Sequence, residues 1–211
     1  MNKFKEQICE FAHIMEQKGL CNAVEGNISY LDRVNNLLYV TPSGTRKLTL
    51  TEDQVAVIDA ETEKQVGGSL KASSEFRLHL GVLNARPDCD SAYHCHAPFL
   101  TAFACSGEDI ECDFYHEIPA GYDKIPCVPY GTPGTHKIEL EASKLLQQPN
   151  CNVVLLGNHG VVAVGKDVSD SSKRLEAAEA AAKIVTITKA FHTPKPIPAD
   201  ELEHLHKNFH L

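Results

Sequence analysis

The stretch "AYHCHAPF" (residues 92–99) places two histidines, His94 and His96, one residue apart inside an apolar run. An apolar run of this length predicts a strand that buries its side chains. Side chains at positions i and i+2 of a strand point to the same face, so the two imidazole rings are expected to stand side by side. That arrangement suits two adjacent metal ligands, but a pair of hydrogen-bonded core histidines would give the same pattern. The stretch predicts a strand and leaves both interpretations of its histidines open.

Helical and strand-like patterns alternate on both sides of this stretch. Helices are predicted within residues 3–18, 71–87, 137–148, 169–191 and 198–211. Short apolar runs bounded by turn residues predict strands at residues 27–32, 37–42 and 55–59. The run "VVLLGNHGVVAVG" (residues 153–165) predicts two further strands joined by a tight turn. Because strands and helices are interleaved, we expect a sheet covered by helices on both faces.

The composition is that of an ordinary globular protein: 211 residues, of which 43% are hydrophobic and 23% charged. We expect one domain over residues 1–211, with a mobile tail from about residue 193. Neither a signal peptide nor a membrane-length apolar run is recognisable, so we expect a cytoplasmic protein without a membrane partner. The eight cysteines show no C-x-x-C spacing, which favours reduced thiols. The net charge of -8 argues against nucleic acid as a partner.

Further metal ligands have to come from other parts of the chain. His159 lies in "GNHG", whose glycines would allow a sharp bend toward a neighbouring strand, although a lone loop histidine can equally be a solvated one. Glu75 follows two serines at a predicted helix start, where the helix dipole alone also favours glutamate. His79, four residues later on the same helical face, is either a rival ligand or a residue behind the ligands.

Six motifs occur together in the order and spacing of the class II aldolase/adducin family. They are "EGNIS" (25–29), "TPSG" (41–44), "SSEFRLH" (73–79), "HCHAPFLTA" (94–102), "IPCVPYGTPGT" (125–135) and "GNHG" (157–160). Through them the chain resembles this family over nearly its whole length. The resemblance implies an α/β fold with three α/β/α layers around a mixed, largely antiparallel sheet, and a homotetramer with ring symmetry.

The resemblance also assigns site residues. It implies a Zn²⁺ ion held by His94, His96, His159 and Glu75. It implies a phosphate pocket lined by Asn27, Thr41, Ser43, Gly44, Ser73 and Ser74. Serines at a helix start and a glycine-containing turn both supply N–H donors to an anion, which agrees with this pocket. A family tyrosine contributed by a neighbouring subunit corresponds to Tyr115, ten residues before "IPC".

The implied reaction is the zinc-dependent, reversible cleavage of a ketose 1-phosphate, with L-fuculose 1-phosphate expected first, to dihydroxyacetone phosphate and a short hydroxyaldehyde. Glu75 would serve as general base once substrate displaces it from the metal, and Tyr115 would act on the aldehyde oxygen. Glu rather than Asp at position 75 favours cleavage over epimerisation. His116 and Glu117 beside the tyrosine leave a dehydratase or decarboxylase open, although Glu117 can equally be a solvated interface residue. The complete ligand set argues against a non-catalytic, adducin-like scaffold.

Overall fold

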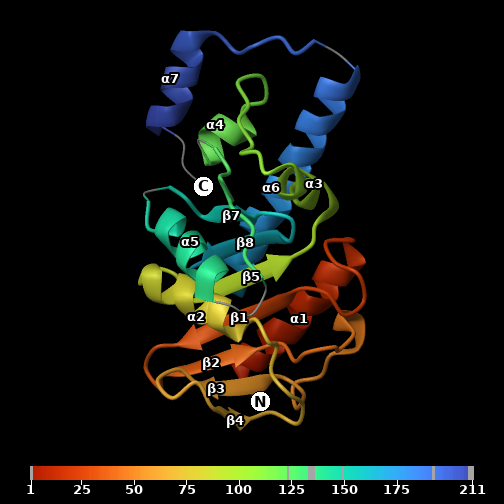
Figure 1. Cartoon of the computed structure of the whole chain (residues 1–211), viewed down its shortest axis with the longest axis vertical. Helices are drawn as coiled ribbons and strands as arrows, with labels where there is room; N and C mark the ends of the chain where they lie inside the picture. Colours follow the sequence, from red (N-terminus) through yellow and green to blue (C-terminus); the bar gives the residue numbers. More distant parts are fainter. Residues whose placement is uncertain (1, 123, 133–135, 149, 192, 209–211) are drawn as a thin grey trace.

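The computed structural model describes residues 2–122, 124–132, 136–148, 150–191 and 193–208, and these form an eight-stranded sheet in the order β4-β3-β2-β1-β5-β8-β7-β6 (Figure 1). Its strands are β1 (Asn27–Asp32), β2 (Leu37–Val40), β3 (Ala56–Asp59), β4 (Gln65–Gly67), β5 (Ser91–Cys95), β6 (Cys127–Val128), β7 (Val153–Leu156) and β8 (Gly160–Gly165). Neighbouring strands pair antiparallel, except that β6 and β7 are parallel. The expected mixed, largely antiparallel sheet is confirmed.

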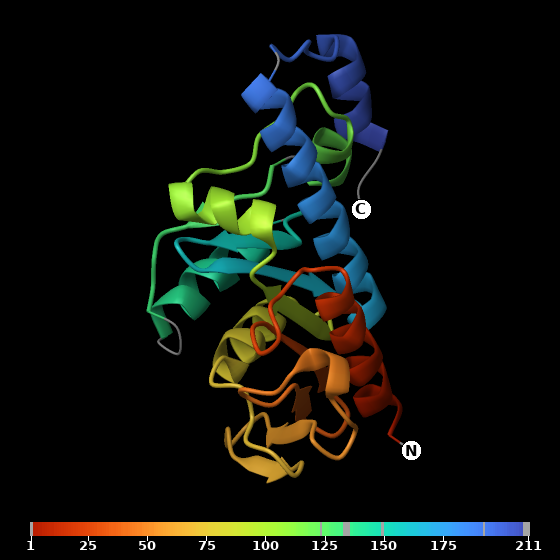
Figure 2. The same cartoon turned by 90° about the vertical axis from the view of Figure 1, so that its right-hand side faces the viewer.

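Helices cover both faces of the sheet. They are α1 (Lys3–Gln17), the short 3-10 helix η1 (Lys47–Thr49), α2 (Phe76–Ala85), α3 (Pro98–Ser106), α4 (Glu117–Gly121), α5 (His136–Leu146), α6 (Val168–Phe191) and α7 (Ala199–Asn208). Figure 2 shows α1 and α6 along one face and α2 and α5 on the other, and the residue contacts agree. The three-layer arrangement is therefore confirmed. None of the helices in the described ranges is long and apolar enough to cross a membrane.

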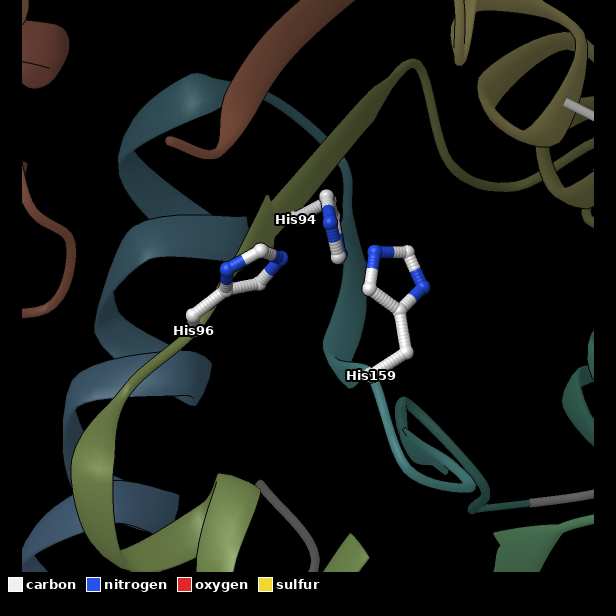
Figure 3. A group of neighbouring side chains, drawn as sticks. All are labelled: His94, His96 and His159. Carbon is white, nitrogen blue, oxygen red and sulfur yellow. The ribbon is translucent and has the colours of Figure 1, made fainter. Parts of the chain in front are cut away.

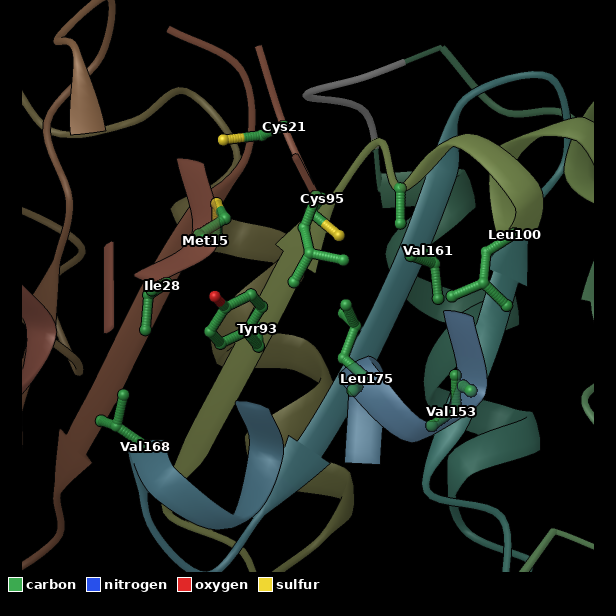
Figure 4. Close-up of a cluster of buried hydrophobic side chains, with 14 of the residues drawn as sticks. Met15, Cys21, Ile28, Tyr93, Cys95, Leu100, Val153, Val161, Val168 and Leu175 are labelled. Carbon is green, nitrogen blue, oxygen red and sulfur yellow. The ribbon is translucent and has the colours of Figure 1, made fainter. Parts of the chain in front are cut away.

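The alternation of side chains along β5 separates two cores. Tyr93 and Cys95 point into the core shared with α1, α3 and α6, whereas Ala92 points into the core shared with α2 and α5. Tyr93 is fully buried, and its hydroxyl donates a hydrogen bond to the Phe11 carbonyl oxygen (3.2 Å). Figure 4 shows its ring on β5 within this cluster. The two cores hold β5 and β8 in place, and these are the strands next to the histidines.

Several elements were not expected from the sequence. Helix α3 is apolar on all sides, so it lacks the one-sided pattern that identifies a surface helix; Pro98 begins it and Gly107, at φ 72°, ends it. Strands β4 and β6 have three and two residues, too few to show a period. The segment from residue 193 is described as far as residue 208, and its helix α7 packs against α4. Its mobility stays a prediction, and residues 133–135 of the expected "IPCVPYGTPGT" motif lie outside the described ranges.

Helix α3 is capped by a carboxylate from another helix. Its N-cap residue is Ala97, which has no side-chain cap, and the Glu179 carboxylate of α6 accepts hydrogen bonds from the backbone N–H groups of Phe99 (3.0 Å) and Leu100 (2.9 Å). Burial raises the pKa of Glu179, and these two hydrogen bonds oppose the shift. Glu179 thereby anchors the helix that directly follows His96.

Replacing Glu179 with alanine is expected to lower the free energy of unfolding by about 1–3 kcal/mol, because two buried N–H donors lose their acceptor. Urea unfolding followed by circular dichroism measures the change. Glu10→Ala, on the exposed side of α1, is the matched control and should change stability by less than about 0.5 kcal/mol. Equal unfolding midpoints for Glu179→Ala and the unmodified protein would show that the cap contributes nothing.

Candidate active site

Three histidines meet at the end of β5. His94 belongs to β5, His96 follows its last residue, and His159 comes from the turn between β7 and β8. The ring centroids lie 5.2 Å apart for His94 and His96, 4.8 Å for His94 and His159, and 5.0 Å for His96 and His159. One ring nitrogen from each lies within 4.8 Å of the others, and Figure 3 shows the rings turned toward a common space. The structure brings together the three histidines that were expected to bind metal.

The local backbone explains how His159 reaches the other two. The turn bends at Asn158, which has φ 55° and donates its N–H to the Ala104 carbonyl oxygen at the end of α3 (2.8 Å). A Cβ atom at Gly160 would lie 2.5 Å from the Cys95 carbonyl oxygen and 2.7 Å from the His96 ring. The sequence argument attributed the bend to the glycines. The structure instead places the left-handed residue at Asn158 and uses Gly160 for close approach to the rings.

The histidines present lone pairs to the shared space. The Nδ1–H group of His94 donates to the Val161 carbonyl oxygen (2.8 Å), which leaves Nε2 as the nitrogen of this ring that faces the shared space. The Nε2 atoms of His94 and His96 are buried and have no hydrogen-bond partner among the described residues. Burial, with His94 nearby, lowers the pKa of His159 to about 4 and also lowers the pKa of His96. At neutral pH His96 and His159 are therefore uncharged imidazoles, the form that binds metal.

Glu75 completes the group. Its Oε2 lies 3.4 Å from His94 Nε2 and its Oε1 lies 3.3 Å from His159 Nε2. Burial raises the pKa of Glu75, but His94 and a hydrogen bond from Asn27 lower it by more, to about 2. Oε1 is buried without a hydrogen-bond partner in the part of the chain that the structure describes. Glu75 is therefore an ionised carboxylate with one oxygen left for a ligand.

This donor set fits a zinc ion. Imidazole nitrogens and carboxylate oxygens are the donors that zinc takes in catalytic sites, and here three imidazoles and one carboxylate, all partly or fully buried, face one space. Glu75 itself is the N-cap residue of α2, so the helix begins one residue later than the paired serines suggested. The Ser73 hydroxyl accepts a hydrogen bond from the Glu75 backbone N–H (3.3 Å), which anchors the approach to the helix.

A buried hydrogen-bond chain supports Glu75 from behind. The Asn27 amide donates from Nδ2 to Glu75 Oε2 (2.8 Å), and its Oδ1 accepts from His79 Nε2. His79 Nδ1 in turn accepts from the Ser29 hydroxyl (2.6 Å). Burial, assisted by His94, lowers the pKa of the fully buried His79 to about 3, so His79 is neutral. Both of its nitrogens are used, which places His79 behind the ligand rather than among the rivals for the metal.

The buried neutral His79 makes the metal-free protein sensitive to acid. The unfolded chain binds a proton on this residue below its ordinary pKa of 6.5, whereas the folded protein does so only near pH 3. Stability should therefore fall as the pH falls through this window, by about 1.4 kcal/mol per pH unit for this group. His79→Gln removes the group and should lower the slope of the unfolding free energy against pH by about 1.4 kcal/mol per pH unit between about pH 6.5 and 5. The slope that remains comes from His96 and His159, whose pKa values burial also lowers. Urea unfolding in a chelating buffer measures both slopes, and parallel slopes would refute the assignment.

Glu25 is a site residue that sequence reasoning did not identify. Its Oε2 lies 3.5 Å from His96 Nδ1 and also accepts from the Asn22 side chain (3.2 Å). Strand β1 pairs antiparallel with β5 so that Asn27 is opposite His94, and the same register carried two residues outward places Glu25 opposite His96. The pairing of the strands was the signal that could have revealed it, and pairing is not visible in the periodicity of either strand.

The expected phosphate residues gather beside Glu75. An isolated bridge joins Pro42 to Ala72, and the Ser73 N–H donates to the Thr41 carbonyl oxygen (3.2 Å). This brings the "TPSG" turn against the paired serines. The residues on this edge are Thr41 and Ser73, which are buried, and Ser43, Gly44 and Ser74, which are exposed. Asn27, the sixth expected member, directs its amide to Glu75 instead of toward this edge.

A buried cation lies beneath the same turn. Lys47 is 1% exposed, and its Nζ donates to the carbonyl oxygens of Thr45 (3.1 Å) and Val24 (3.3 Å). Burial lowers the pKa of Lys47. Sequence reasoning did not single it out, because lysines in polar segments are normally exposed. Its amine ties the "TPSG" turn to the loop that carries Glu25.

Tyr115 lies apart from the histidine cluster. It precedes α4, its ring is 5.7 Å from that of His116, and none of its described contacts reaches the three histidines. Burial, together with the charge of Glu117, raises the pKa of Tyr115. His116 Nε2 and Glu117 Oε1 lie 3.1 Å apart, and both side chains are largely exposed. Within one chain, the tyrosine and the metal ligands are therefore separate groups.

Comparison with known proteins gives the family. A family model described as the class II aldolase and adducin N-terminal domain matches residues 6–186. The chain is 30% identical over 209 residues to the 5-deoxy-D-ribulose 1-phosphate aldolase of Bacillus thuringiensis serovar kurstaki, covering 99% of this chain and 96% of that protein. It is 31% identical over 200 residues to the L-fuculose phosphate aldolase of Escherichia coli, covering 95% and 90%. A solved L-fuculose 1-phosphate aldolase superposes with a TM-score of 0.88 at 27% identity, covering 98% and 96%. The chain therefore belongs to the class II aldolase and adducin family, as one of its metal-dependent lyases.

Proposed function

We propose that this protein is a zinc-dependent aldolase that reversibly cleaves a ketose 1-phosphate, with L-fuculose 1-phosphate first among the candidates, to dihydroxyacetone phosphate and a short hydroxyaldehyde. The observation that carries the proposal is the Glu75 carboxylate facing three histidine rings, beside a turn at residues 41–44 that is bridged to the segment of the paired serines. The names of two similar proteins, an L-fuculose phosphate aldolase and a 5-deoxy-D-ribulose 1-phosphate aldolase, support the substrate class.

His94, His96 and His159 would hold the zinc, with Glu75 as a fourth ligand that substrate displaces. When bound, zinc supplies a Lewis acid that polarises the ketone oxygen and stabilises the negative charge developing there. In the direction of synthesis, Glu75 takes the proton from carbon 3 of dihydroxyacetone phosphate. In cleavage it returns that proton after the bond between carbons 3 and 4 has broken. No lysine of the site is needed for a Schiff base.

The substrate phosphate would bind at Thr41, Ser43, Gly44, Ser73 and Ser74, whereas Asn27, the sixth residue expected there, directs its amide to Glu75. Backbone N–H groups of a turn, together with serine hydroxyls, bind anions without a full positive charge. Such local donors are needed here, because the net charge of -8 repels an anionic substrate. We propose that the protein binds neither a nucleic acid nor a membrane. The eight cysteines, all free in the structure, support a reducing location such as the cytoplasm.

The active enzyme is proposed to be a homotetramer with ring symmetry. Tyr115 cannot serve the histidines of its own chain through any contact described above, so a neighbouring protomer has to supply it. The outer half of α6 exposes three large apolar side chains, which supports a subunit contact there. They are Ile184, Ile187 and Phe191, the last being 75% exposed.

Substitution of Tyr115 by phenylalanine separates the two halves of the reaction. Because the tyrosine is assigned only to the aldehyde oxygen, the variant should still exchange the carbon 3 proton of dihydroxyacetone phosphate with solvent. Cleavage of the ketose 1-phosphate should slow by about 100-fold or more. Proton NMR in deuterated water and a coupled triose phosphate assay measure the two rates on the same sample. Equal loss of both would contradict the assigned role.

The reaction class is tested by assaying the zinc-loaded enzyme for triose phosphate released from a panel of ketose 1-phosphates. Release of dihydroxyacetone phosphate from L-fuculose 1-phosphate, or from another member of the panel, supports the proposal. Epimerised, dehydrated or decarboxylated product without triose phosphate would support a related enzyme instead. The exposed pair of His116 and Glu117 beside Tyr115 is the observation that favours a dehydratase or decarboxylase as second candidate.

A further inference from the structure

The structure assigns a positioning role to Asn27 and His79. We propose that these two side chains hold Oε2 of Glu75, so that Oε1 stays directed at the reacting carbon after substrate has displaced the carboxylate from the metal. This inference rests on the proposed function and deepens it. It also gives Asn27 a task different from the phosphate binding expected from the sequence.

The direction of every hydrogen bond in the chain follows from one fact. The Asn27 amide turns its Nδ2–H to Glu75 Oε2 and its Oδ1 to His79 Nε2, and an amide oxygen can only accept. His79 must then carry its proton on Nε2 and accept at Nδ1. The Ser29 hydroxyl, at 2.6 Å, must supply that last proton. The chain has a single consistent orientation, in which each donor points toward Glu75.

The four side chains are paired by two rigid elements. Asn27 and Ser29 stand two residues apart on β1 and so share a face of the sheet, whereas Glu75 and His79 are four residues apart at the start of α2 and share a helix face. Asn27 is 4% exposed, and Ser29 and His79 are fully buried. Packing and hydrogen bonding therefore hold Asn27 independently of any metal ion.

Glu75 needs this support because of its place in the helix. It is the N-cap residue, with φ -94° and ψ 9°, and its side chain makes no cap hydrogen bond with its own helix. The hydrogen bond from Asn27 to Oε2 is what fixes the carboxylate plane. Oε1 has no hydrogen-bond partner among the described residues and lies 3.3 Å from His159 Nε2. Oε1 is therefore the oxygen left to bind metal and then to take the proton.

A positioning role and a phosphate-binding role make opposite kinetic predictions. Loss of a phosphate contact raises KM and weakens the competition by inorganic phosphate, while the exchange rate at saturation remains. Loss of the support for Glu75 lowers the exchange rate at saturation and weakens zinc binding, while phosphate competition remains. Residues that orient a metal ligand in this way are worth about 10- to 100-fold in metal affinity or activity.

The experiment uses zinc-reconstituted Asn27→Ala and Ser29→Ala. Three quantities are measured: the zinc dissociation constant by chelator competition, the exchange rate of dihydroxyacetone phosphate at saturation, and the inhibition constant of inorganic phosphate. For Asn27→Ala we expect about 10- to 100-fold losses in zinc affinity and in exchange rate. Phosphate inhibition should change by less than about 3-fold. Ser29→Ala removes the hydrogen bond that fixes the tautomer of His79, so we expect smaller losses in zinc affinity and in exchange rate. The substitution removes only one oxygen atom, so the packing around it should change little.

Two controls bracket the result. Ser74→Ala, on the exposed serine of the phosphate edge, should weaken phosphate inhibition and leave zinc affinity unchanged. His13→Gln alters a histidine whose Nε2 meets the Leu50 carbonyl oxygen outside the site, and it should change none of the three quantities. Unchanged zinc affinity in both Asn27→Ala and Ser29→Ala overturns the positioning role. The zinc affinities of these two variants test the positioning role even if the unmodified enzyme exchanges no proton. Absence of exchange would contradict only the proposed aldolase reaction.

Discussion

Glu75→Gln is expected to abolish the exchange of the carbon 3 proton of dihydroxyacetone phosphate with solvent. A general base contributes about 100- to 10,000-fold to the rate of proton transfer, and glutamine keeps the shape of the side chain while removing the base. The depressed pKa of Glu75, about 2, means that the carboxylate is ionised throughout the neutral range in the free protein. Proton NMR in deuterated water follows the exchange without any aldehyde present.

The matched control for this substitution is Glu117→Gln. Glu117 is an exposed glutamate beside His116, away from the histidine cluster. It should leave the exchange unchanged if the reaction is aldol cleavage. If Glu117→Gln stops turnover and Glu75→Gln does not, the dehydratase or decarboxylase interpretation takes precedence.

His94→Ala is expected to remove zinc and activity together. His94 is fully buried, its ring lies within contact of both other histidines, and its free nitrogen faces the shared space. Removal leaves two imidazoles and the Glu75 carboxylate that substrate is proposed to displace, so one of the three lasting protein ligands is lost. Loss of one ligand should lower the zinc affinity by at least about 100-fold. Elemental analysis after dialysis measures the metal, and the coupled assay measures cleavage.

Substitution of an exposed histidine serves as control for that loss. His136, at the start of α5, is exposed and pairs with Glu139, so His136→Ala should retain stoichiometric zinc. His96→Ala should behave like His94→Ala. Stoichiometric zinc in both His94→Ala and His96→Ala would show that the histidine cluster is not the metal site.

Segments with a clear hydrophobic pattern and clear end signals were predictable from the sequence, and the other segments were not. Strand β1 has the bounds that its short apolar run and the turn residues after it predicted, and α1 stops near Gly19 as its capping signal required. Helix α3 was not predicted, because its apolar residues are not confined to one face. The order of the strands also required more than periodicity, because β1 pairs with β5 across nearly sixty residues of sequence and no local pattern encodes that contact.

The site, like the fold, was predictable where local patterns report it and not where it depends on contacts between distant segments. The H-x-H spacing pointed to His94 and His96. The "GNHG" turn and the serine-led helix start offered His159 and Glu75 as candidates, and the resemblance to the family assigned them. For His79, the sequence left open a place among the metal ligands or behind them, and the structure shows the second. The contacts of Ser29 and of Asn27 with this residue did not follow from either source. Ser29 and His79 are fifty residues apart in the chain and meet only because α2 packs on β1. Such contacts depend on how elements pack together, which the spacing of residues within one element does not report.

The most direct test of the central claim is the exchange of dihydroxyacetone phosphate with solvent by the unmodified protein, first stripped of metal and then restored with zinc. The account predicts no exchange without metal, full exchange after stoichiometric zinc is added, and no restoration in Glu75→Gln. Exchange that is independent of metal, or its absence in the zinc-loaded protein that also releases no triose phosphate, would contradict it.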